Sequence, residues 1–216
     1  MLTLKGSLRG WLILGKSWCW IMDSIHPSVR ALLGEIERAL DAKLYYSAIA
    51  VALSVPDVCA SLELDPAVPS WSTKDKYEAW FASNLGSIFK NLTASDCYRL
   101  RGGVLHQGHF RHPKARYDRI IFLLPDSPFR AHDVVVSIAK DVVIGGLTRA
   151  EITGRDQTGD VLYLEAVRFC KQIIEAARLW AIAKKDDANV QANLPNLVRL
   201  RPEGLPPFIV GVPLIA

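Results

Sequence analysis

The chain has 216 residues, of which 50% are hydrophobic and 22% are charged, and its 26 Lys and Arg against 22 Asp and Glu give a formal net charge of +4. This length suits one domain, and the composition excludes disordered, collagenous, coiled-coil and low-complexity chains. The small positive excess permits a polyanionic partner without requiring one.

The four cysteines are far apart in the sequence, and no two of them form a C-x-x-C pair. This pattern argues against a secreted disulfide scaffold and against a zinc ribbon. It predicts reduced, buried thiols in a cytoplasmic protein. The four residues are Cys19, Cys59, Cys97 and Cys170.

Residues 1–21 superficially resemble a signal peptide, because Lys5 and Arg9 precede an apolar stretch. Lys16 interrupts that stretch, no small-x-small cleavage site follows, and the stretch is too short to span a membrane. We therefore expect no membrane association. Residues 1–21 are predicted to be an N-terminal arm, packed or loose, or an artefact of the assigned translation start.

The chain from Ser24 onward has helical periodicity for about seventy-five residues. Apolar residues at three- and four-residue spacing predict a first helix that starts at His26-Pro27-Ser28, since Pro is tolerated in a first turn. The second helix, from about Tyr45 to Glu63, is apolar almost all round and is expected to be central and buried. Pro56 is expected to kink or split it.

Two further helices follow a loop that ends near Ser70. Thr73 can cap the third helix, and the aromatic residues of this helix are expected to fill the core. The fourth helix is expected to begin near Thr93, Ser95 or Asp96 and to end at Gly108 in a left-handed conformation.

The periodicity then changes. Residues 119–124 and 134–138 are β-rich and are separated by prolines, which predicts a small hairpin or strand insertion between residue 118 and about 150. Helical periodicity returns from 160 to 185, and the Pro-rich but apolar tail from 194 is expected to dock on the body or on a partner.

These elements predict a mainly α fold. We expect a four- to five-helix bundle over residues 22–193, with a small antiparallel β insertion and a docked Pro-rich C-terminal tail over 194–216.

The segment from Arg99 to Arg119 contains most of the features that suggest chemistry. It holds three of the five histidines and six Arg or Lys residues against one acid, Asp118. Such a run is often only a solvated face, but it also suits a polyanion. The histidines are His106, His109 and His112, and the other basic residues are Arg99, Arg101, Arg111, Lys114, Arg116 and Arg119.

In this segment Arg101-x4-His106 and Arg99-x6-His106 stand near the end of a late helix, within the phrase Tyr98-Arg-Leu-Arg-Gly-Gly-Val-Leu-His-Gln-Gly108. The phrase resembles the catalytic-helix ending of the HEPN superfamily of helical-bundle ribonucleases and nucleotide-binding domains. The resemblance covers residues 24 to about 110 and the helix at 160–185. The chain departs from the pattern at Gly102, where many active members carry a polar residue.

The resemblance implies metal-independent RNA cleavage by a homodimer, without a cofactor, in a toxin or antiphage defence setting that can include an antitoxin partner. His106 would act as general acid or base, because histidine exchanges protons near neutral pH. Arg101 would hold the phosphate and stabilise the transition state. The remaining RNA contacts would come from Arg99, His109, Arg111, Lys114 and Arg116.

Helix geometry limits how Arg101 and His106 can cooperate. Residues five apart on a continuous helix are about 140° apart around the axis and about 7.5 Å apart along it. Either the helix opens at Gly102 and Gly103, or two chains face each other in a dimer. Arg99 and His106, seven apart, share a face at about 10.5 Å, which suits a phosphate-binding strip.

Other interpretations of the same residues stay open. Arg101 could be a structural ion-pair partner and His106 a histidine packed in a helix seam. The protein could then be a non-catalytic module that binds RNA, nucleotide or a partner protein. Three regularly spaced histidines suggest a metal, but no Cys pair or H-E-x-x-H motif accompanies them, so no metal site is predicted. The sequence has no P-loop, no G-x-S-x-G motif and no convincing helix-turn-helix.

Overall fold

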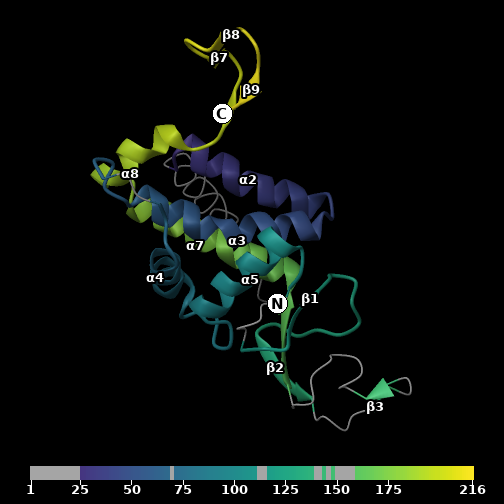
Figure 1. The fold of residues 1–216 in the computed structure, drawn as a ribbon. Coiled ribbons are helices and arrows are strands. Elements are labelled where there is room, and N and C mark those ends of the chain that lie inside the picture. The colour runs from purple at the N-terminus through teal and green to yellow at the C-terminus, as the bar shows by residue number, and fades with distance from the viewer. Residues whose placement is uncertain (1–24, 69–70, 111–115, 139–142, 145–146, 149–158) are drawn as a thin grey trace, which may run out of the picture.

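A computed structural model describes residues 25–68, 71–110, 116–138, 143–144, 147–148 and 159–216. These residues are mainly helical, with short strands between and after the helices (Figure 1). The predicted mainly α class is therefore confirmed. The α-helices are α2 (Pro27–Asp41), α3 (Tyr45–Leu62), α4 (Lys74–Leu85), α5 (Ala94–Gln107), α7 (Ala166–Ala183) and α8 (Ala188–Asn193), followed by the short 3-10 helix η1 (Leu194–Asn196).

Helix α3 lies at the centre and packs against α2, α4, α5 and α7. Its alanines, among them the fully buried Ala48 and Ala52, let the neighbouring helices approach closely. Pro56 lies inside α3, but the helix continues to Leu62, so the predicted splitting does not occur. The predicted central position of this helix is confirmed.

Helix α3 is also the one helix in the described residues that is long and apolar enough to cross a membrane by length and composition. Half of that window is buried inside the body. A core helix of a soluble protein passes the same test, so this property is weak support for a membrane span.

The aromatic side chains of α4 fill the core as predicted. Tyr77 is completely buried, its hydroxyl donates a hydrogen bond to the carbonyl of Leu53 at 3.1 Å, and its oxygen lies 3.2 Å from the sulfur of Cys97. Trp80 and Phe81 are at most 5% exposed.

The described cysteines confirm the prediction of buried, unpaired thiols. Cys59, Cys97 and Cys170 are free and buried. Burial raises the pKa of the Cys97 and Cys170 thiols to about 12. These thiols therefore stay protonated near neutral pH, and they are core residues and not nucleophiles. Cys19 lies outside the described residues.

Three strands form a mixed sheet in the order β1-β5-β2. The strands are β1 (Arg119–Leu123), β2 (Val134–Ile138) and β5 (Gly159–Glu165). β1 runs parallel to β5, with Arg119 opposite Val161, and β2 runs antiparallel to it, with Val134 opposite Tyr163. A separate two-stranded ladder joins β3 (Val143–Ile144) to β4 (Leu147–Thr148).

The predicted β insertion after residue 118 is present, but a hairpin of its two β-rich runs and its end at about 150 are wrong. β1 and β2 are not neighbours, because β5 lies between them. The β-rich part also extends to Glu165, and the helix predicted to start at 160 begins at Ala166. The buried residues of β5 include Val161, Leu162 and Leu164, a short apolar run whose spacing fits helix and strand equally well. Pairing with two strands distant in sequence decides in favour of a strand.

Two adjacent residues before β2 tie the sheet to the helices. The carboxylate of Asp133, a residue with a left-handed φ of 56°, accepts the backbone N–H groups of Lys90, Asn91 and Leu92 at 2.5, 3.1 and 3.0 Å. The Nδ1 of His132 accepts the backbone N–H of Glu165 at 3.1 Å.

The second ring nitrogen of His132, Nε2, lies 2.7 Å from the side-chain oxygen of Gln172 and donates to it. The ring packs beside Phe89 at a centroid distance of 5.8 Å. With Nδ1 accepting and Nε2 donating, His132 is neutral in this arrangement.

We expect His132 to make the fold less stable in mild acid. Burial is the main cause that lowers the pKa of His132 below 6.5, and the charge of Arg168 lowers this pKa further. The hydrogen bond to Gln172 and the charges of Glu165 and Asp133 oppose the shift. A histidine whose pKa is lower in the folded state than in the unfolded state contributes stability at pH values above its unfolded-state pKa. The protein loses that stability as the pH falls through the folded-state pKa.

The measurement is the free energy of unfolding in urea from about pH 7 to about pH 5. The loss on acidification should be smaller in His132→Gln, which keeps a polar side chain that does not titrate. Burial also lowers the pKa of His26, so His26 too makes both proteins less stable as the pH falls. Equal slopes in the two proteins would contradict the assignment to His132.

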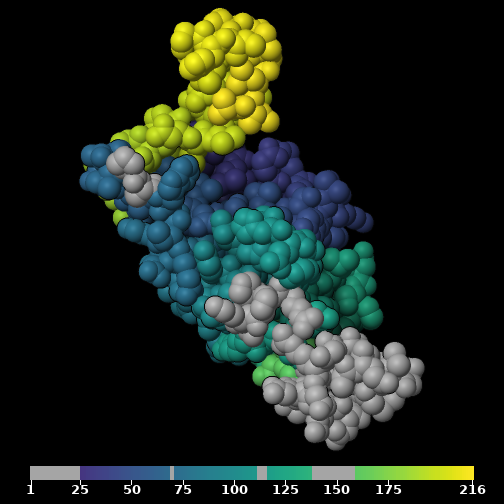
Figure 2. Space-filling view, in the orientation of Figure 1, coloured from purple at the N-terminus to yellow at the C-terminus, as the bar shows by residue number. Residues whose placement is uncertain are grey.

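The C-terminal segment forms two small ladders, β6 (Leu200–Arg201) with β9 (Leu214–Ile215) and β7 (Gly204–Leu205) with β8 (Ile209–Val210). These ladders stand off from the helices as a separate lobe (Figure 2). Leu194 is buried, whereas Val198, Phe208 and Ile215 are 73%, 83% and 74% exposed. The tail thus contacts the body at Leu194 and lies beside α2 at residues 199–204, and docking of its exposed apolar side chains on a partner stays a prediction.

Candidate functional site

Helix α5 positions the residues that the sequence singled out, and its two ends are set by local hydrogen bonds. The Thr93 hydroxyl accepts the backbone N–H of Asp96 at 3.2 Å, and the Asp96 carboxylate accepts the backbone N–H of Thr93 at 3.2 Å. This capping box confirms the predicted start. Gly108 ends the helix with a left-handed φ of 68°, which confirms the predicted end.

Between these ends α5 is a continuous helix that includes Gly102 and Gly103. The alternative in which the helix opens at the glycines is therefore wrong for this chain. A continuous helix places Arg101 and His106 about 140° apart around the axis and about 7.5 Å apart along it. The two side chains do not converge within one chain.

Arg101 forms an ion pair with Asp57 of α3. The two side chains are 23% and 18% exposed, and the guanidinium also lies over the ring of Tyr98 at 5.8 Å from its centroid. Burial raises the pKa of Asp57, and the Arg101 charge opposes this shift. Arg101 thus joins α5 to α3, which is the structural role that the sequence left open for it.

Arg116 also has a structural contact. Its guanidinium lies 3.0 Å from the carboxylate of Asp96, which is 3% exposed, and it hydrogen-bonds to the carbonyl of Asn91 and to the hydroxyl of Tyr117. An RNA contact by Arg116 stays a prediction, but its charge already balances a buried carboxylate.

One face of α5 keeps its polar side chains available. Arg99 is half-buried and makes no ion pair with a described residue, and His106 is exposed in the last turn. Between them lies Gly102, where an added Cβ would meet no atom of the described residues within 4 Å. Arg99 and His106 are about 10.5 Å apart along the helix axis. We call this surface the Arg99–Gly102–His106 face.

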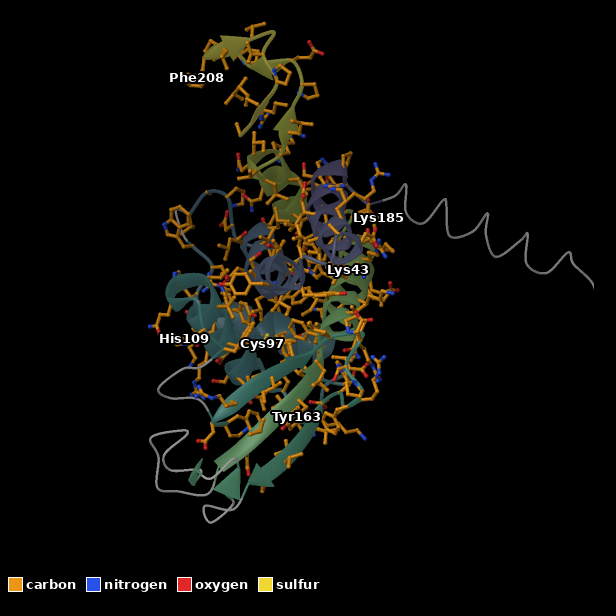
Figure 3. The ribbon with its side chains drawn as sticks, turned by 90° about the vertical axis from the view of Figure 1, so that its right-hand side faces the viewer. Lys43, Cys97, His109, Tyr163, Lys185 and Phe208 are labelled. Atoms are coloured by element: carbon orange, nitrogen blue, oxygen red, sulfur yellow. The ribbon has the colours of Figure 1, made fainter. Side chains whose placement is uncertain are left out.

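His109 follows the helix and is exposed, and its backbone N–H donates to the carbonyl of Gly103 at 3.2 Å. Figure 3 labels it at the end of α5, with Cys97 from the buried side of the same helix. The other predicted RNA contacts, Arg111 and Lys114, lie outside the described residues.

Sequence reasoning missed Asp57, although a signal for it was present. Asp57 is the one charged residue in the apolar α3 helix, directly after Pro56. A lone carboxylate in a buried helix requires a partner, because an isolated buried charge is costly. The sequence did not indicate that this partner is Arg101.

Within the described residues, no group of three or more His, Cys, Asp or Glu side chains is arranged to hold a metal ion. No family model, curated protein or solved structure matches the chain.

Proposed function

We propose that this protein binds RNA on the Arg99–Gly102–His106 face of α5 and, as a homodimer, cleaves the bound strand without a metal ion. In this proposal α2, α3, α4, α5 and α7 are the helices of a HEPN-like bundle. The β1-β5-β2 sheet is inserted between α5 and α7.

The observation that carries this proposal is Gly102. Glycine inside a helix lowers stability by about 1 kcal/mol relative to alanine. An alanine methyl would meet no atom of the described residues at this position, so packing within the described part of the chain does not require the glycine. A bare backbone between an arginine and a histidine allows a phosphodiester chain to approach α5 closely.

Residue chemistry on this face suits RNA. The permanently charged fork of Arg99 binds phosphate oxygens, and His106 is placed to exchange a proton with the 2′-hydroxyl or with the leaving oxygen. The phosphorane that develops during cleavage needs a further positive charge. In a two-fold dimer that charge comes from Arg101 of the second copy.

A second candidate function is RNA binding without cleavage. The ion pair between Arg101 and Asp57 favours it, because Arg101 must leave or share this partner before it can bind a phosphate. This candidate retains Arg99 and His106 as binding residues and removes the catalytic role of Arg101.

The test is incubation of the purified protein with a single-stranded RNA and with tRNA in excess EDTA, beside His106→Ala. We expect the parent alone to leave 2′,3′-cyclic phosphate ends. We also expect the logarithm of the RNA-binding constant to fall linearly with the logarithm of the salt concentration. Salt-sensitive binding without cleavage would select the second candidate, and absence of RNA binding would refute both.

The Gly102→Ala variant tests the stability of the fold and the affinity for RNA separately. We expect the free energy of unfolding to rise by about 1 kcal/mol, because the methyl group has space and alanine favours the helix. RNA affinity should fall, because the methyl group stands between Arg99 and His106. Fluorescence anisotropy and urea unfolding measure the two effects.

The matched control is Gly34→Ala in α2, where the added Cβ would contact only the flexible end of Arg38 at 3.2 Å. It should raise stability in the same way and leave RNA affinity unchanged. Unchanged affinity in Gly102→Ala would contradict a close approach of RNA to this face.

A further inference from the structure

A groove of about 430 Å³ opens beside the end of α5. It lies between the α2–α3 turn, which contributes Lys43 and Leu44, and the aromatic side chains of Tyr46, Phe110 and Phe122. Figure 3 labels Lys43 at this turn.

The fold leaves the rings of this groove partly uncovered. Tyr46 is 51% exposed and lies edge-on to Phe110 at 6.3 Å, and Phe110 lies 5.3 Å from Phe122. Leu44, on the same wall, is 58% exposed. Exposed apolar side chains that gather in one groove are typical of a binding surface.

The groove is continuous with the last turn of α5. The Tyr46 hydroxyl donates to the carbonyl of Val104 at 3.1 Å, two residues before His106. After Gly108 the chain turns back, and Phe110 packs against Tyr46. The aromatic wall is therefore held against the last turn of α5, on a side of the helix about 160° around the axis from His106.

Lys43 adds a cation to the groove at an unusual backbone position. Its φ is 59°, in the left-handed region that favours glycine. This conformation ends α2 as a left-handed cap, because the backbone N–H of Leu44 donates to the carbonyl of Ala39 at 2.8 Å. A positive charge beside exposed rings is the combination that single-stranded nucleic acids require.

We propose that this groove binds an unpaired nucleobase of single-stranded RNA, stacked on Tyr46, while the strand continues round the C-terminal end of α5 to the Arg99–Gly102–His106 face. This proposal rests on the proposed function and specifies its substrate as single-stranded RNA. Bases inside a duplex are already stacked on each other, and only splayed bases can reach an aromatic wall.

The test compares three RNAs of equal length by fluorescence anisotropy: a single-stranded oligonucleotide, the same ribose-phosphate chain without bases, and a duplex. The wild-type protein should prefer the single strand. Tyr46→Leu should lower affinity for the single strand about 5- to 100-fold. Its affinity for the abasic chain should match that of the wild type.

Phe129→Leu is the matched control. Phe129 is 50% exposed and packs edge-on to Tyr163 at 5.3 Å. Tyr163 is next to Leu164 in β5, and neighbouring residues of a strand point to opposite faces of a sheet. Leu164 is fully buried and pairs with Phe122, so Phe129 lies on the face away from the groove. This variant should bind all three RNAs as the wild type does.

Leu44→Ser is a second variant, for the case in which Tyr46→Leu is unstable. Leu44 is the N-cap residue of α3 and makes no side-chain capping bond, so serine is compatible with the helix. We expect a smaller loss of affinity, again confined to the single strand.

The outcomes separate the two proposals. If the wild type binds no RNA, the proposed function fails. If it binds single-stranded and abasic RNA equally, or Tyr46→Leu weakens both or neither, RNA binding stands and the base-binding groove is refuted. A change from dimer to monomer in Tyr46→Leu would show that a second copy occupies the groove.

Discussion

In a mixed dimer that joins an Arg101→Ala chain to a His106→Ala chain, we expect RNA cleavage to return to about half the wild-type rate. Each variant alone should be about 10²- to 10⁴-fold less active than the wild type, because His106→Ala removes the general acid or base and Arg101→Ala removes the charge that stabilises the transition state. In the mixed dimer one of the two sites retains its arginine from one copy and its histidine from the other.

The physical reason is the continuity of α5. No bend at Gly102 or Gly103 brings the Arg101 and His106 side chains together, because the helix runs from Ala94 to Gln107. A two-fold axis beside α5 allows the arginine of one copy to face the histidine of the other.

Different affinity tags on the two chains allow the mixed dimer to be purified. A mixed dimer as inactive as the two variants would contradict a shared site, and so would a monomeric wild-type protein. Arg99→Gln serves as a control. It should weaken RNA affinity whether the site lies within one chain or is shared by two chains. A mixed dimer that contains this variant should regain no activity.

Asp133→Ala should lower the free energy of unfolding by about 3 kcal/mol. The substitution removes an acceptor from the backbone N–H groups of Lys90, Asn91 and Leu92. Hydrogen bonds to a charged group contribute more than neutral ones, and unpaired N–H groups in a partly buried loop are costly.

The consequence should extend to α5, because residues 90–92 lead directly into its N-cap, Thr93. Urea unfolding measures the overall loss. Hydrogen exchange should show faster opening at the start of α5 than at its end. The control is Asp126→Ala, an exposed carboxylate in the turn that follows β1. Equal losses in the two variants would contradict the role of Asp133.

Local signals in the sequence determined where most helices begin and end. Pro27, Thr73, Thr93 and Gly108 each act on backbone groups within a few residues, so their effects could be predicted without knowledge of the rest of the chain. The apolar α3 was recognisable as a central helix for a similar reason, since a helix without a polar face must be covered on all sides.

Only the tertiary structure decided the strand order and the partners of the charged residues. Gly159–Glu165 became a strand because it pairs with β1 and β2, and its own apolar spacing fits either structure. Arg101 pairs with Asp57, Arg116 with Asp96, and Asp133 with the loop before α5, each across a long stretch of chain. The sequence by itself determined caps and apolar faces, which depend on neighbouring residues, whereas ion pairs and strand pairing depend on which distant segments the packed core brings into contact.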